Sequence, residues 1–317
     1  MNKAIRILAV AALGLGASAA SASDFPQGPI EVTVPFAAGG GLDQNARAFA
    51  KAFSEALDTP VAVMNRDGAA GAIGLAFVAG ARADGYALAF TPAVSLTSQP
   101  HRVKTIKYNV DSFSPVCHVF DNIFAIAVLA NSPYKTFADA LAGARKDPGA
   151  VSYGTSGIGS IPHLGTADIE AAAKVQLNHV AYKGDGPMMQ DLLGGRLGFG
   201  AVLASSVRAQ VQAGTLRLLA VYSEQRHPHF PAVPTLTESG VPVVQLSFGG
   251  LLAPAKTPPA VLEKLQAACE RAVKSPSYVD WASKAGQVVE YQPAEAFGRK
   301  LREDSRAKEA TIKRLGL

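Results

Sequence analysis

Cysteine is scarce in this chain, which has only Cys117 and Cys269 among its 317 residues. This scarcity excludes a small disulfide-stapled scaffold, because such folds need several bridges in a short chain. In an oxidising compartment the two cysteines could pair, or each could be a separate buried side chain. Their positions in the sequence do not decide between these alternatives.

Signatures of metal and nucleotide binding are also missing. The sequence has no CxxC or HExxH, and its six His residues do not cluster at the spacing of metal ligands. No Walker A or G-x-G-x-x-G motif stands between a predicted strand and a predicted helix. We therefore expect no metal site and no cofactor.

Long basic runs and long apolar runs are absent as well. The formal net charge is +5, and no cluster of Lys and Arg is interleaved with aromatic residues. Nucleic-acid binding therefore has no support. Beyond the first residues, no stretch is long and apolar enough to cross a membrane.

The N-terminus has the pattern of a secretory signal. Basic residues precede an apolar run from Ile7 to Ala17, and Ala20-Ser21-Ala22 suits cleavage before Ser23. About 11 apolar residues are too few for a membrane anchor. We expect a signal peptide over residues 1–22 and export to the periplasm, and the remainder is long enough for two domains.

Strand and helix patterns alternate along the rest of the chain. Apolar residues alternate with polar ones from Ile30 to Phe36, which predicts a strand, and they recur at helical spacing from Gln44 to Leu57. Similar units follow, and three helices are predicted over 259–274, 276–286 and 293–315. The segment 91–108 has weak periodicity and no assignment. The alternation predicts an α/β fold of mainly parallel sheets flanked by helices.

Glycine-rich or polar loops follow several of the predicted strands. The first contains Gly39-Gly40-Gly41 and leads into a helix that Asp43 is expected to cap, and a later one ends at Ser160, another expected cap. Glycine lets the backbone approach a ligand, and a helix start supplies unpaired N–H groups that suit an anion. Ligands of such folds bind at the carboxyl ends of strands, so these distant loops predict two lobes that share one cleft.

The order of these motifs resembles the periplasmic solute-binding proteins of tripartite tricarboxylate transporters, the TctC-like or Bug family. The resemblance spans nearly all of the chain after the predicted signal. The motifs are Pro35-Phe36-x-x-Gly39-Gly40-x-x-Asp43, Asn65-Arg66-x-Gly68, Asp84-Gly85-Tyr86, Ser156-Gly157-x-Gly159-Ser160-x-Pro162-His163, Tyr182-Lys183-Gly184, Leu192-Leu193-Gly194-Gly195 and Pro234-Thr235-x-x-Glu238-x-Gly240.

The resemblance implies a two-lobed periplasmic binding protein of type II style, with the ligand cleft between the lobes. Lobe 1 would comprise residues 23–121 and 226–317, and lobe 2 residues 122–225. The implied role is a monomeric, non-enzymatic receptor that binds a small organic mono-, di- or tricarboxylate and delivers it to membrane transporter subunits. Backbone N–H groups, rather than an Arg clamp, would bind the ligand. The ligand-binding residues carried over are Phe36, Ala37, Ala38, Gly39, Gly40 and Asp43 from lobe 1, and Thr155, Ser156, Gly157, Ser160, His163, Lys183 and Gly184 from lobe 2.

One departure from the family pattern bears on the ligand, and two alternative functions stay open. Val202-Leu203 stand where many members carry Asp-Asn, which allows a less polar ligand tail. The receptor could report to a membrane sensor instead of a transporter. A secreted hydrolase would need a serine activated by His163, but Thr155-Ser156-Gly157 does not complete G-x-S-x-G, and Ser160 lies too close in sequence for good geometry.

Overall fold

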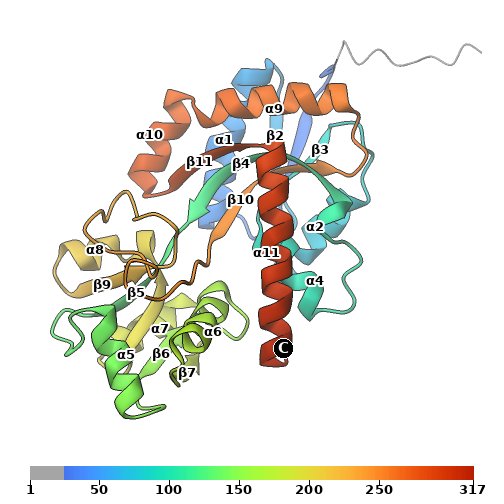
Figure 1. The fold of residues 1–317 in the computed structure, drawn as a ribbon. Helices are drawn as coiled ribbons and strands as arrows, with labels where there is room; N and C mark the ends of the chain where they lie inside the picture. The colour runs from blue at the N-terminus through green and yellow to red at the C-terminus, as the bar shows by residue number, and fades with distance from the viewer. Residues whose placement is uncertain (1–24) are drawn as a thin grey trace, which may run out of the picture.

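The computed structural model describes residues 25–317, so the predicted signal peptide lies outside the described residues. Two sheets, each flanked by helices, form two lobes (Figure 1). The two-lobed α/β architecture is therefore confirmed. None of the helices in residues 25–317 has both the length and the apolar character needed to cross a membrane.

The sheet of lobe 1 has six strands in the order β11-β4-β10-β3-β1-β2. They are β1 (Ile30–Val34), β2 (Val61–Asn65), β3 (Ala87–Pro92), β4 (Phe113–Asn122), β10 (Ser247–Pro254) and β11 (Val288–Pro293). The helical segments of this lobe are α1 (Gly41–Leu57), η2 (Ala69–Gly71), α2 (Ala72–Ala79), α3 (Val94–Thr97), α4 (Gln99–Arg102), η3 (Val110–Ser112), α9 (Pro259–Val273), α10 (Pro276–Ala285) and α11 (Ala294–Leu315).

The sheet of lobe 2 has five strands in the order β7-β6-β8-β5-β9. They are β5 (Phe124–Leu129), β6 (Ser152–Thr155), β7 (Asn178–Ala181), β8 (Phe199–Leu203) and β9 (Leu216–Val221). Its helical segments are α5 (Phe137–Lys146), α6 (Ile161–Ala173), α7 (Asp185–Leu193), η4 (Ala204–Val207) and α8 (Arg208–Gln212).

Both sheets are mixed, with a parallel part joined to antiparallel strands. β1 pairs parallel with β2 and β3, but β10 pairs antiparallel with β3 and β4. The connections between the lobes explain this result. The chain leaves lobe 1 through β4 and returns through β10, so these two strands run in opposite directions side by side. In lobe 2, β5 is likewise antiparallel to β8 and β9.

The chain crosses between the lobes at two places. Only Ile123 separates β4 from β5, whereas residues 222–246 connect β9 to β10. The strands of the larger sheet therefore come from both ends of the chain and those of the smaller sheet from its middle. The lobe boundaries at 121/122 and 225/226 stay a prediction.

The core of lobe 1 depends on the apolar stripe of α1. Phe49 and Phe53 stack at 5.3 Å, and Phe49 also stacks on Phe90 of β3. All three rings are fully buried. This burial fixes α1 against the sheet, and its N-terminus then lies beside the carboxyl end of β1.

A disulfide joins Cys117 of β4 to Cys269 of α9, with 6.5 Å between the Cα atoms. The sequence left open whether these residues pair. Both are buried in the core of lobe 1. The bridge therefore ties the crossover strand β4 to a helix that comes 152 residues later.

Candidate functional site

The loop between β1 and α1 presents backbone groups at the carboxyl end of β1. Residues 37–40 of this loop are exposed. Gly39 has a φ of +82°, a conformation that favours glycine. The helix cap is Gly40 and not Asp43, which is the third residue of α1, so the predicted cap is wrong. The N–H groups in the first turn of α1 have no carbonyl partner within the helix, and the positive end of the helix dipole lies there.

Asp43 holds this loop in place. Its carboxylate accepts hydrogen bonds from the Gly39 N–H at 2.8 Å, the Asn65 Nδ2 at 2.9 Å and the Arg47 Nε at 2.9 Å. Asn65 also donates to the carbonyl of Phe36 at 3.0 Å. The hydrogen bond from Arg47, with those from Gly39 and Asn65, lowers the pKa of the buried Asp43 carboxyl to about 2. Asp43 therefore shapes the loop, and its direct contact with a ligand stays a prediction.

In lobe 2, two stacked histidines support the loop after β6. The rings of His163 and His179 lie 4.1 Å apart and are nearly parallel. His163 Nδ1 accepts the Gly159 N–H at 2.8 Å, and His179 Nε2 is 2.8 Å from the Thr155 hydroxyl. Burial, with His179 and Arg102 nearby, lowers the pKa of His163 to about 4, so its imidazole is neutral. Sequence reasoning did not include His179, because it lies on β7, apart from the loop motif.

The loops after β6 and β7 lie side by side. The Gly184 N–H donates to the Ser156 carbonyl at 3.2 Å, and Ser160 caps α6 by accepting the His163 N–H at 3.4 Å. The predicted cap at Ser160 is therefore confirmed. Lys183 is exposed, whereas Thr155 is fully buried. The structure thus gathers the predicted residues of lobe 2 into one cluster of two loops.

Arg102, at the end of α4 in lobe 1, contacts this cluster of lobe 2. Its Nη2 donates to the carbonyl of Ile158 at 3.3 Å. A Cβ at Gly159 would lie 2.4 Å from the Arg102 Cζ and would displace the guanidinium, and the φ of +71° also favours glycine. The segment 91–108 has no predicted structure because its periodicity is weak, and Arg102 was therefore not predicted as a site residue.

A second contact between the lobes joins α11 to α6. Asp168 of α6 accepts from the Thr311 hydroxyl at 3.0 Å and from the Arg314 Nη2 at 2.6 Å. Figure 1 shows α11 descending from lobe 1 beside the lower lobe. Two polar contacts therefore link the lobes in addition to the covalent crossovers.

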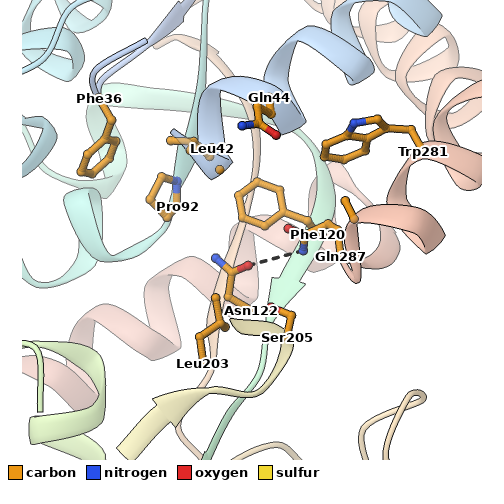
Figure 2. A pocket seen from close by; sticks show the side chains of 12 residues that line it. Phe36, Leu42, Gln44, Pro92, Phe120, Asn122, Leu203, Ser205, Trp281 and Gln287 are labelled. Atoms are coloured by element: carbon orange, nitrogen blue, oxygen red, sulfur yellow. Dashed lines mark hydrogen bonds between the residues drawn. The ribbon is translucent and has the colours of Figure 1, made fainter. Parts of the chain in front are cut away.

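A cavity of about 350 Å³ lies between the lobes. Lobe 1 supplies most of its walls, and lobe 2 contributes Leu203 and Ser205 (Figure 2). Phe36 is the one predicted site residue among those that line it. The lining residues are Phe36, Gly41, Leu42, Gln44, Pro92, Phe120, Asn122, Leu203, Ser205, Trp281, Ala285 and Gln287.

The loops of the site offer neutral hydrogen-bond donors. Within residues 25–317, no group of three His, Cys, Asp or Glu side chains is arranged to hold a metal ion. The His163 ring faces a backbone N–H and another imidazole, while the Ser160 hydroxyl caps a helix. This arrangement suits reversible binding of an anion at loop N–H groups.

Known proteins resemble the whole described chain. The profile of the tripartite tricarboxylate transporter family receptor matches residues 45–317. A UPF0065 protein of Cupriavidus necator is 34% identical over 311 residues, which is 98% of this chain and 94% of that protein. The structure of a TctC solute-binding protein from Polaromonas has a TM-score of 0.85 and 34% identity, and covers 92% of this chain and 100% of its own. The structure of an R. palustris protein with adipate has a TM-score of 0.73 and 28% identity, and covers 92% of this chain and 99% of its own. This chain belongs to the tripartite tricarboxylate transporter receptor family.

Proposed function

We propose that this protein is a non-catalytic periplasmic receptor that binds a small organic carboxylate between its lobes. The observation that carries the proposal is the cavity between the lobes, which borders the N-terminus of α1. The R. palustris relative with adipate supports a carboxylate as the ligand. Membership of the tripartite tricarboxylate transporter receptor family supports delivery to membrane transporter subunits, and we propose that the receptor acts as a monomer.

The binding step uses neutral donors. A carboxylate replaces water at the N–H groups of the exposed loop residues Ala37, Ala38 and Gly40 and of the first turn of α1, where the helix dipole favours an anion. No buried cation has to be desolvated for this contact. Closure of the lobes then brings the loop at Ser156–Ser160 and the loop at Lys183–Gly184 to the other side of the ligand.

Calorimetric and thermal-denaturation titrations with a panel of carboxylates test this function. A ligand at 100 times its Kd stabilises the folded protein by about 2.7 kcal/mol. An esterase and amidase assay on the same preparation tests the absence of catalysis. Turnover without stabilisation by any carboxylate would show that the protein is an enzyme and not a receptor.

A pair of glycine variants locates the site. Gly40→Leu adds a side chain at the start of α1, where a Cβ meets no atom closer than 3.5 Å, so the fold tolerates it. We expect this side chain to block the loop N–H groups and abolish binding. Gly28→Leu is the matched control, because Gly28 also has open space and precedes the opposite end of β1. Normal binding by Gly40→Leu would place the pocket elsewhere.

A further inference from the structure

The cavity between the lobes has an uncharged lining. Among the described residues, the 12 that line it include no Asp, Glu, Lys, Arg or His. An ionised group that enters such a space loses its hydration without gaining a counter-charge, which is costly. The lining therefore offers a second or third carboxylate no counter-charge.

Apolar side chains form most of the lining. Three aromatic rings come from separate elements: Phe36 from the β1–α1 loop, Phe120 from β4 and Trp281 from α10 (Figure 2). Aliphatic side chains add to these rings, and they are Leu42, Pro92, Leu203 and Ala285. Such walls favour an apolar ligand body, because both surfaces leave water on binding.

Two of the polar side chains in the lining already bond to the protein. Gln287 Nε2 donates to the Asp121 carbonyl at 2.9 Å and approaches Asn122 Oδ1 at 3.4 Å, the contact drawn in Figure 2. Gln44 Nε2 donates to the Gly39 carbonyl at 3.0 Å. The Asn122 amide and the Ser205 hydroxyl can satisfy a neutral polar substituent. One amide and one hydroxyl are fewer donors than the loop and helix N–H groups that hold the first carboxylate.

The two arginines near the loops, Arg47 and Arg102, are engaged outside the cavity, and the exposed Lys183 does not line it. Arg47 bonds to Asp43 and to Asn65, and Arg102 bonds to the carbonyl of Ile158. Neither Arg47 nor Arg102 lines the cavity. The N–H groups at the start of α1 therefore border a cavity with an uncharged lining, to which Phe36 and Gly41 contribute.

We propose that the cleft selects a monocarboxylate with an apolar body the size of one ring or a short chain, in preference to a di- or tricarboxylate. This inference rests on the proposed function, because the loop N–H groups must hold the single carboxylate. A volume of about 350 Å³ lies near the lower end of ligand pockets and so limits the body to this size.

Matched ligands test the inference by calorimetry on the purified full chain. Hexanoate and adipate have the same chain length and differ by one carboxylate, as benzoate and terephthalate do on one ring. We expect the monocarboxylate of each pair to bind at least tenfold more tightly, which is about 1.4 kcal/mol. A ratio below tenfold, or tighter binding of the dicarboxylate, overturns the inference but leaves the carboxylate receptor standing. If no carboxylate binds, the proposed function fails first.

Three variants show whether the cavity is the cause. Leu203→Arg places a cation on the lobe 2 wall and should raise adipate affinity at least tenfold relative to hexanoate. Val279→Arg, on the same helix as Trp281 but 43% exposed and outside the lining, should leave the ratio unchanged. Trp281→Ala should weaken benzoate binding while acetate, which is too short to reach the ring, is unaffected. An unchanged hexanoate-to-adipate ratio in a folded Leu203→Arg protein would refute the assignment.

Discussion

Asp43 is buried yet ionised, and replacing it with asparagine tests how the first binding loop is held. The carboxylate accepts three hydrogen bonds, from Gly39, Asn65 and Arg47. Asparagine is isosteric, but it has one acceptor oxygen, and its NH₂ group would face one of these donors. We expect Asp43→Asn to lower the free energy of unfolding and to loosen Gly39, so that carboxylate binding weakens as well.

The magnitude follows from the pKa of Asp43, which is lowered from 3.8 to about 2 by the hydrogen bond from Arg47 and by its other donors. This difference corresponds to roughly 2 kcal/mol. Because 51% of the Arg47 side chain is exposed, solvent screens part of the interaction, and about 1–2 kcal/mol is the expected loss. A carboxyl with a lowered folded-state pKa stabilises the fold above pH ~4, and this stabilisation is lost as the pH falls towards 2.

Thermal denaturation from pH 7 down to pH 2 measures this dependence. At pH 7 the Asp43→Asn protein should melt a few degrees lower than the original, since 1 kcal/mol shifts the Tm of a large domain by about 2–4 °C. The two curves should converge near pH 2, where Asp43 itself is protonated. Glu55→Gln removes a carboxylate from the exposed face of the same helix and serves as the control. Equal Tm values at pH 7, or a gap that persists at pH 2, would refute the role given to Asp43.

Three further changes probe the second loop, the link between the lobes and the disulfide. His163→Asn keeps an acceptor for the Gly159 N–H but removes the group whose folded pKa is about 4, so the protein should lose less stability between pH 6.5 and 4, as read by thermal denaturation. Asp168→Ala removes the acceptor that joins α6 to α11, and small-angle X-ray scattering should show a larger radius of gyration without ligand. Cys117→Ser with Cys269→Ser opens a link across 152 residues and should lower the free energy of unfolding by roughly 2–4 kcal/mol, measured in urea.

Elements with strong local patterns could be predicted from the sequence. The helices predicted over 259–274 and 276–286 appear as α9 and α10, each ending within one residue of the predicted end. The strand at Val288–Pro293 was missed, because it is a short edge strand between two helices and its pairing partner β4 lies far away in the sequence. Strand direction was missed for a similar reason, since periodicity does not report how the chain crosses between lobes.

The candidate site could be predicted only where its residues lie together in a single loop. Phe36 and the glycines after it form a contiguous motif, and the structure places them at the carboxyl end of β1. Trp281, Gln287 and Asn122 meet in the cavity from segments far apart, and no local spacing signals that meeting. The loop motifs therefore predict where a carboxylate binds, whereas the walls that surround the rest of the ligand come from tertiary packing.

The loop N–H groups and the cavity lining contribute differently to how the receptor discriminates among ligands. Backbone N–H groups bind any carboxylate, so they supply affinity without distinguishing one acid from another. Discrimination must come from the lining of the cavity. There Leu203 of lobe 2 and the aromatic residues of lobe 1 surround a volume of about 350 Å³. Because both lobes contribute to that apolar space, closing them around an apolar body removes water from both walls at once. A charged tail in the same space would have to keep its water and so would oppose closure. The same apolar contact can thus govern both which acid binds and whether the lobes close on it.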